Sequence, residues 1–338
     1  MSTYPKNSLR LSLRQVTHQA ELINSYEMVD SNGDDLPAYT AGSHIDFYFH
    51  DGIVRQYSLC GDPSDRKRYL IAILNDQKGR GGSTALHNRL HVQRYVHVSE
   101  PRNNFPVAKE AKHHLMIAGG IGVTPMLSMI YELQKTTVAP YHGAPSSDAK
   151  DNFTLHYCTK SKDHTAFQPE LAKLIDQGKV VVHHDQGVPG NGLNIQELLQ
   201  DYDDGTHLYY CGPPGFMKAV KQFSSHWPED TVHFEYFNAP EPEDTTKIDS
   251  NNQGSQIKIA STGAVYTVPD GKTIVEVLQE NNVAIETSCN VGLCKTCVIK
   301  YLEGEVKHMD CVLSKTEQEE YLTPCCSRSV GDLLILDL

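Results

Sequence analysis

Three cysteines near the end of the chain have a spacing that suits iron and sulfide chemistry. Cys289, Cys294 and Cys297 follow one another as C-x4-C-x2-C. Three thiolates this close together can converge on one point only if the loop curls around it, and Gly292 permits that curl. The backbone N–H groups of a curled loop face inward and hydrogen-bond the negatively charged sulfur atoms. The spacing therefore predicts a 2Fe-2S cluster, a centre that accepts one electron at a time.

A structural zinc ion is the alternative for such a loop. Zinc ribbons prefer paired C-x2-C knuckles, whereas this region has one knuckle preceded by a four-residue step. The spacing alone leaves the fourth ligand open, because Cys311, Cys325 and Cys326 all follow the loop.

A glycine-rich run, GGIGVTP, directly follows the apolar segment HLMIA. Its Gly119, Gly120 and Gly122 stand where a backbone must approach a diphosphate and where a helix N-terminus can face it. We expect Thr124 to be the N-cap of that helix and Pro125 its first residue. The run departs from the strict G-x-G-x-x-G pattern, so a simple tight turn is the alternative. The interpretation we favour is a pyridine nucleotide site.

A flavin is expected between these two centres. A hydride carries two electrons whereas the cluster takes one, so a carrier that handles both must connect them. The run Gly79-Arg80-Gly81-Gly82-Ser83 brings exposed amides, a guanidinium and a hydroxyl together, which is anion-binding chemistry. A flexible turn is the alternative for this run.

Segments of different pattern must position these groups. From about Leu9 to Pro106, short runs of β-branched and aromatic residues alternate with turns, which predicts an antiparallel β-barrel. From His113 onward, strand-like runs alternate with helix-like runs, which predicts a doubly wound parallel α/β sheet. The acidic run APEPEDTTKIDSNNQG that follows indicates an exposed linker. The expected division is a barrel domain at 1–107, a nucleotide domain at 108–239, a linker at 240–254 and a cluster domain at 255–338.

Charge and composition narrow the class of partner. The net charge is -12, and residues 241–338 carry eight Lys and Arg against sixteen Asp and Glu, so we expect no nucleic-acid partner. The acidity either keeps the protein soluble or steers a basic face of an electron acceptor. The N-terminus lacks an apolar signal core, glycines and a proline break the most apolar run, and the nine cysteines suggest a reducing compartment. These features predict a cytoplasmic protein that does not associate with membranes.

Five motifs occur in the order typical of one family. The segments ETSCNVGLCKTCVIKYLEGEV and YLTPCCSRS, the GGIGVTP run, the Cys-Gly-Pro step at 211–213 and the Arg-Gln-Tyr-Ser run at 55–58 together resemble the phthalate dioxygenase reductase and vanillate demethylase reductase family. The resemblance covers essentially the whole chain. It implies a Greek-key barrel for the flavin, a nucleotide domain and a C-terminal α+β ferredoxin domain of the β-grasp type.

The resemblance also implies roles for particular residues. Ser58 would approach flavin N5, Cys211 would lie near the nicotinamide, Glu235 would complete the catalytic set, and Phe237 would cover the other face of the flavin. Cys325 would be the fourth cluster ligand, because the family's ligand immediately precedes a residue followed by Ser-Arg. The expected ligands are therefore Cys289, Cys294, Cys297 and Cys325. The residues expected to bind flavin or nucleotide are Arg55, Gln56, Tyr57, Ser58, Ala72, Ile73, Leu74, Gly81, Gly82, Ser83, Gly119, Gly120, Gly122, Thr124, Pro125, Cys211, Gly212, Pro213 and Phe237.

The cofactors implied are FMN, with FAD as the alternative, and NADH. Lys160 and Lys162 would nonetheless tolerate the 2'-phosphate of NADPH. Lys295 is a departure from the family, since many relatives have Gly there, and it puts a cation beside the cluster.

The function implied is that of the reductase component of a two-component Rieske oxygenase, with the terminal oxygenase as partner. Two alternatives stay open. The acceptor could instead be a cytochrome or a diiron oxygenase, or the chain could be a non-catalytic zinc-binding interaction module.

Overall fold

The computed structural model describes residues 4–5, 7–49, 54–77, 81–136, 152–188, 190–237 and 254–338. Within it the chain forms two compact units, Met1–Phe237 and Asn238–Leu338. Gly79 and Arg80 of the predicted anion-binding run, and the predicted linker up to residue 253, lie outside the described residues.

The first sheet of unit 1 is an antiparallel barrel. Its elements are β1 (Leu9–Ala20), β2 (Ile23–Val29), β3 (Ser43–Tyr48), β4 (Val54–Ser58), β5 (Tyr69–Leu74), α1 (Gly82–Arg89), β6 (Tyr95–Val98) and β7 (Arg102–Asn103). The strands pair in the order β4-β3-β6-β1-β2-β5, with β7 added to β3. The two outer strands of this order meet through a bridge between Leu59 and Ile71, and the Cys60 N–H donates to the Leu70 carbonyl at 2.9 Å. The sheet therefore closes on itself and leaves few unpaired edges.

The second sheet of unit 1 is parallel. Its strands are β8 (His113–Gly119), β9 (Phe153–Thr159), β10 (Val180–His184), β11 (Thr206–Cys211) and β12 (Val232–Glu235). They pair in the order β10-β9-β8-β11-β12, and every neighbouring pair is parallel. From β8 the chain adds β9 and β10 on one side, and it then returns to add β11 and β12 on the other side of β8. The topological switch point therefore lies between β8 and β11, and ligands of such sheets bind there, outside the carboxyl ends of the strands.

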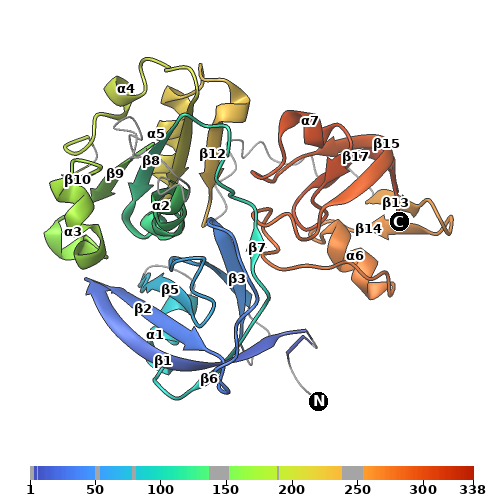
Figure 1. The fold of residues 1–338 in the computed structure, drawn as a ribbon. Coiled ribbons are helices and arrows are strands. Elements are labelled where there is room, and N and C mark those ends of the chain that lie inside the picture. Colours follow the sequence, from blue (N-terminus) through green and yellow to red (C-terminus); the bar gives the residue numbers. More distant parts are fainter. Residues whose placement is uncertain are drawn as a thin grey trace, which may run out of the picture. The chain divides into compact units, whose positions relative to one another are not determined.

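Helices cover both faces of the parallel sheet (Figure 1). They are α2 (Val123–Thr136), α3 (Gln168–Asp176), α4 (Ile195–Leu198) and α5 (Pro214–Phe223), with 3-10 turns at Gly120–Gly122, Lys162–His164 and Glu229–Thr231. Alternate residues of a strand point to opposite faces, so Met116 of β8 packs with α2 and α3, while Ile117 packs with α4 and α5. This is the doubly wound arrangement.

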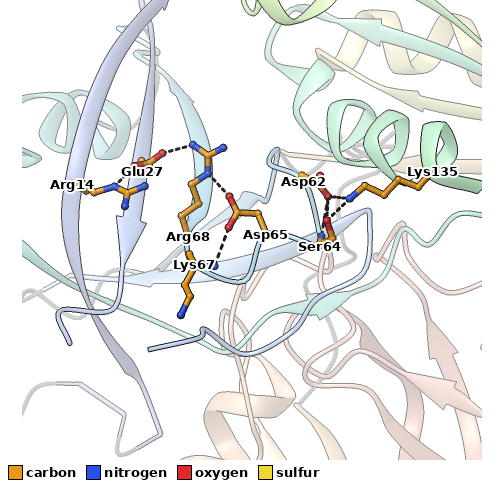
Figure 2. Close-up of polar contacts among 8 residues, drawn as sticks. All are labelled: Arg14, Glu27, Asp62, Ser64, Asp65, Lys67, Arg68 and Lys135. Atoms are coloured by element: carbon orange, nitrogen blue, oxygen red, sulfur yellow. Dashed lines mark hydrogen bonds and ion pairs between the residues drawn. The ribbon is translucent and has the colours of Figure 1, made fainter. Parts of the chain in front are cut away.

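The barrel and the parallel sheet share one apolar core. Ile23 and Phe105 from the barrel side pack in the same buried cluster as Met129 of α2. Polar contacts join the same surfaces: Lys135 of α2 donates to the Asp62 carboxylate and the Ser64 hydroxyl (Figure 2). These contacts fix the barrel against the nucleotide-binding sheet within unit 1.

A carboxylate network stiffens the barrel itself. Glu27, on β2, accepts hydrogen bonds from Arg14 and Arg68, each at 2.5 Å, and Arg68 also donates to Asp65 at 2.8 Å (Figure 2). Hydrogen bonds from the two guanidinium groups lower the pKa of Glu27 in spite of its burial.

Unit 2 is a mixed sheet covered by a helix. Its elements are β13 (Ser255–Ile259), β14 (Val265–Val268), α6 (Ile274–Glu280), β15 (Ile299–Lys307), α7 (Lys315–Gln318), β16 (Tyr321–Leu322) and β17 (Arg328–Leu336). The strand order is β14-β13-β17-β15-β16, in which β13 and β17 are parallel. Ile274, Val277 and Leu278 of α6 are buried against the sheet. A capping box between Thr273 and Glu276 begins that helix.

The predicted fold class is confirmed, as antiparallel barrel, doubly wound sheet and ferredoxin-like sheet follow one another along the chain. Two local predictions are wrong. The helix after the glycine run begins at Val123, so Thr124 lies inside it and donates to the Ile121 carbonyl at 3.1 Å instead of capping. Pro125, predicted to be the first residue of this helix, is therefore its third. The exact domain limits stay predictions. No helix among the described residues is long and apolar enough to cross a membrane.

Candidate functional site

The three predicted catalytic side chains come from three different strands of unit 1. Ser58 ends β4 of the barrel, whereas Cys211 and Glu235 end β11 and β12 and are direct neighbours in the parallel register. The Ser58 hydroxyl donates to Glu235 Oε2 at 2.9 Å, so the barrel and the parallel sheet meet at this pair. Cys211 is fully buried beside it.

Burial controls the ionisation of this group of side chains. It raises the pKa of Glu235 to about 7, although the hydrogen bond from Ser58 acts in the opposite direction. Burial, followed by the nearby Glu235 charge, raises the pKa of the Cys211 thiol. Cys211 is therefore a neutral thiol at physiological pH, and Glu235 titrates close to neutrality.

His44 belongs to the same site and was not predicted. It lies on β3 opposite Ser58 in the antiparallel register, and its Nδ1 is 3.7 Å from Glu235 Oε1. The sequence signal was a histidine inside the apolar strand HIDFYF. That signal becomes informative only when the register that pairs His44 with Ser58 is known.

The glycines of the predicted nucleotide site lie where two loops touch at the carboxyl edge of the parallel sheet. A Cβ on Gly122 would stand 2.2 Å from the Cys211 carbonyl oxygen, and a Cβ on Gly119 would stand 2.9 Å from Pro213 Cδ. A Cβ on Gly212 would likewise clash with the Phe216 ring at 2.6 Å. The loop after β8 and the loop after β11 thus meet at the topological switch point, where a dinucleotide is expected.

The predicted anion-binding run begins α1. Gly81 has a φ of 81° and Gly82 is the first residue of the helix. The Arg55 guanidinium lies directly over Gly82, since a Cβ there would stand 2.9 Å from Arg55 Nε. The Ser83 hydroxyl accepts the Asp76 N–H at 3.0 Å. A guanidinium at a helix N-terminus suits a phosphate group, so these residues fit a flavin phosphate.

The remaining predicted flavin residues lie on the two opposite faces of the barrel sheet. Ala72 and Leu74 of β5 pack in the core shared with the parallel sheet, and Phe237 packs against the same core. Ile73 instead points into the barrel core. Tyr57 packs edge-on against Phe47 of the barrel, with ring centroids 6.4 Å apart.

Gln56 is held by Asp46 on the neighbouring strand, through a hydrogen bond from Gln56 Nε2 at 3.0 Å. Asp46 is also paired with Arg102 at 2.7 Å. The side-chain amide of Gln56 is therefore held within the barrel, and its role in binding the cofactor stays a prediction.

The cysteine loop has the backbone that a cluster requires. Gly292 has a φ of 76°, and a Cβ there would stand 2.6 Å from the Cys326 sulfur. The Val291 and Leu293 N–H groups donate to Cys289 Sγ at 3.5 and 3.2 Å. Inward amides of this kind stabilise thiolates, so the loop fits an iron-sulfur cluster.

Sulfur contacts connect the four predicted ligands in series, from Cys294 to Cys289, then to Cys325 and Cys297. Hydrogen bonds from Cys294 and Cys325 lower the pKa of Cys289, and a hydrogen bond from Cys325 lowers that of Cys297. Cys311, by contrast, donates to the Gly292 carbonyl at 3.7 Å. Among the described residues, no group of three or more His, Cys, Asp or Glu side chains has the arrangement of a site for a metal ion. The ligand assignment rests on the loop and on this sulfur contact set, and it stays a prediction.

Cys326 lies next to the ligand set. Its sulfur is 3.1 Å from the Thr323 hydroxyl, and its N–H donates to the Thr323 carbonyl. This contact with Thr323 turns the side chain toward the segment that precedes it.

Comparison with known proteins identifies two domain families in the chain. Residues 257–330 match the model of the 2Fe-2S iron-sulfur cluster binding domain, and residues 116–222 match that of the oxidoreductase NAD-binding domain. A reductase subunit of tert-butanol monooxygenase / tert-amyl alcohol desaturase from Aquincola tertiaricarbonis is 50% identical, over 99% of this chain and 97% of the relative. Vanillate O-demethylase oxidoreductase from Pseudomonas putida is 39% identical, over 95% and 96%.

Solved structures give the same picture. Phthalate dioxygenase reductase, described as a modular structure for electron transfer from pyridine nucleotides to 2Fe-2S, matches with a TM-score of 0.70 and 34% identity, over 100% of both chains. An intact type IV self-sufficient cytochrome P450 monooxygenase matches with a TM-score of 0.83 and 33% identity, over 98% of this chain and 41% of that one.

Proposed function

Because the chain belongs to the phthalate dioxygenase reductase and vanillate O-demethylase reductase family, we propose that it serves a Rieske-type terminal oxygenase in a two-component system. Family membership makes the protein an oxidoreductase with NADH, FMN and a 2Fe-2S cluster as cofactors. The observation that carries the proposal is that reductase subunits of oxygenase systems align with the chain over almost its full length. When bound, FMN would take up the hydride of NADH and release its electrons singly to the cluster.

We propose that the centre at Ser58, Cys211 and Glu235 is where hydride transfer takes place. Ser58 is aligned by its hydrogen bond to Glu235; Ser58 is buried and 14% of the Glu235 side chain is accessible, so little water reaches the pair. Cys211 contributes a neutral, fully buried thiol next to the point where the two glycine loops meet. No general acid or base is required, because proximity and orientation are what hydride transfer needs.

The phosphate end of the flavin is assigned to Arg55 and the α1 N-terminus at Gly82. Opposite charge and the helix dipole both favour an anion there. We assign the nicotinamide dinucleotide to the glycine loops after β8 and β11, where they meet at the carboxyl edge of the parallel sheet, and the cluster to Cys289, Cys294, Cys297 and Cys325.

The substrate of the partner oxygenase does not have to be aromatic. The tert-butanol monooxygenase reductase is 50% identical to this chain, against 35% to 39% for the phthalate and vanillate relatives from Pseudomonas putida. We therefore include tertiary alcohols beside aromatic acids as candidate substrates of the partner.

A second candidate acceptor is a haem protein. The structural match to a self-sufficient cytochrome P450 monooxygenase indicates that a reductase of this shape can occur in the same chain as a P450. The physical requirement is the same for both acceptors, since each takes electrons one at a time.

An anaerobic reduction assay separates the two candidates. NADH and catalytic amounts of the reductase would be mixed with purified Rieske oxygenases of the tert-butanol, vanillate and phthalate types, and with a P450. We expect the visible spectrum of a Rieske oxygenase to change to that of its reduced form within seconds. Reduction of the P450 alone would overturn the proposed partner.

A further inference from the structure

The four predicted cluster ligands come from two segments of unit 2 that must be held together. Cys289, Cys294 and Cys297 share one loop, whereas Cys325 follows α7 and β16. A cluster bound by both segments is lost when either of them moves away, so contacts between the segments control how firmly it is held.

An ion pair joins these two segments beside the ligands. Lys295, between the second and third cysteine of the loop, donates from its Nζ to both carboxylate oxygens of Glu317, at 2.8 and 3.0 Å. Lys295 has a φ of 55°, a left-handed conformation that disfavours residues with a Cβ. Its carbonyl accepts the Val298 N–H at 3.1 Å, which closes the turn that contains Cys297. A lysine in this strained position thus reaches out of the cysteine loop to α7.

The carboxylate that Lys295 meets is itself fixed. Glu317 is the third residue of α7 and accepts the Ser314 N–H at 2.8 Å, while the Glu317 N–H donates to the Ser314 hydroxyl at 3.2 Å. The Tyr301 hydroxyl of β15 donates to the Gln318 carbonyl at 2.9 Å, and the Tyr301 N–H donates to the Glu320 carbonyl at 3.0 Å. The end of the ion pair on α7 is therefore anchored to the sheet.

We propose that the Lys295–Glu317 ion pair is a clip that keeps the three-cysteine loop closed against the segment carrying Cys325 and so retains the cluster. Both are positioning residues, since neither is a predicted ligand. The inference rests on the proposed cluster ligands. The long lysine side chain is what allows a residue of the cysteine loop to reach α7.

The alternative is that the Lys295 charge acts directly on the cluster. In the structure the ammonium is bound to a carboxylate on both oxygens, so the pair as a whole carries no net charge. The two ideas predict different patterns. A clip loses its effect whichever partner is removed, whereas direct electrostatics displaces the reduction potential in opposite directions when the cation or the anion is removed.

The test uses full-length protein purified with its cofactors. Lys295→Met, Glu317→Gln and the double variant would be compared with wild type for the rate of iron release to a chelator. Gln preserves the side-chain oxygen that caps α7, so the helix start is retained. Glu280→Gln is the matched control, because Glu280 forms an exposed ion pair with Lys272 at 2.6 Å, and neither residue lies in the cysteine loop or in the segment from α7 to Cys325.

The pair is partly exposed, with 34% and 41% of the two side chains accessible, so its effect is that of a surface ion pair. We expect each single variant to release iron about two to five times faster than wild type. The double variant should be no faster than the singles, because the same contact is lost in all three. The control should release iron at the wild-type rate. NADH-driven flavin reduction should be unchanged, since it depends on unit 1.

Unchanged release rates in the single variants would overturn the clip. Additive effects in the double variant would overturn it as well, and so would opposite displacements of the cluster potential with no change in release. Absence of iron and sulfide from the wild-type protein would overturn the proposed function together with the clip. A cluster that is present but releases iron at the wild-type rate in both single variants would overturn the clip alone.

Discussion

Replacing Glu235 with glutamine should remove a pH dependence from the stability of unit 1. Burial raises the pKa of this carboxyl from 4.5 to about 7. A carboxyl with a raised pKa binds its proton more tightly in the folded state than in the unfolded state. Its favourable contribution to the free energy of unfolding is therefore complete below about pH 4.5 and is lost as the pH rises through 7. Above about pH 8 almost no further loss is expected from this group.

The size of the effect follows from the shift. About 2.5 pKa units correspond to about 3 kcal/mol of unfolding free energy across the whole window. Between about pH 5 and about pH 8 the wild-type protein should lose about 2.5 kcal/mol more than the Glu235→Gln variant. Taking the difference between the two proteins cancels the other titrating groups.

Urea unfolding followed by tryptophan fluorescence measures this difference. Trp227 is the single tryptophan of the chain. It is buried in the core next to β11, and its Nε1 donates to the Leu199 carbonyl at 3.2 Å, so its fluorescence reports on the sheet that carries Glu235. FMN would be kept in excess in every sample, because a ligand bound only to the folded state adds to its stability.

Ser58→Ala provides a test of the same reasoning in the opposite direction. The Ser58 hydrogen bond lowers the pKa of Glu235, so its removal should raise that pKa further and steepen the loss of stability with pH. Parallel pH profiles for wild type and Glu235→Gln would show that Glu235 ionises normally, which would refute the reasoning.

Further predictions concern the glycine loops, the cluster and the barrel. Gly122→Ala should weaken NADH binding at least about tenfold by titration, because the methyl group has no room beside the end of β11, whereas Gly215→Ala, in open space, should leave binding unchanged. Cys325→Ser should abolish the cluster by iron analysis and visible absorption while Cys326→Ser spares it; a retained cluster in the first variant would mean a different ligand. Glu27→Gln should destabilise the barrel by about 2 kcal/mol at neutral pH in urea unfolding, since two guanidinium groups lose a charged acceptor. A change of less than about 0.5 kcal/mol would show that the network contributes little.

Much of the fold could be predicted because local sequence patterns determine its helices and strands. The apolar run of β8 followed by glycines, and the repeated change between strand-like and helix-like runs, identified the parallel sheet and its nucleotide edge. The wrong N-cap at Thr124 has a local cause. The 3-10 turn at Gly120–Gly122 leads straight into α2, so the helix begins earlier than a capping rule applied to Thr124 would suggest.

The contacts between elements far apart in the sequence could not be predicted from it. Glu235 and Ser58 were each predicted, but their hydrogen bond depends on how the barrel packs on the parallel sheet. His44 joins them only through the register of β3 with β4. Lys295 was recognised as a departure, yet its partner Glu317 could not be found from spacing, since the pairing depends on the fold of unit 2. Side chains that meet across elements obey tertiary geometry rather than sequence pattern.

The central claim is that electrons pass from NADH through the flavin and the cysteine-bound cluster to an external oxygenase. The most direct measurement compares wild type with Cys294→Ser in an anaerobic mixture of NADH, reductase and Rieske oxygenase, followed by rapid-mixing absorbance. We predict that both proteins bleach their flavin band with NADH, and that only wild type reduces the oxygenase. Equal reduction of the oxygenase by both proteins, or loss of flavin reduction together with electron delivery in the variant, would contradict the account.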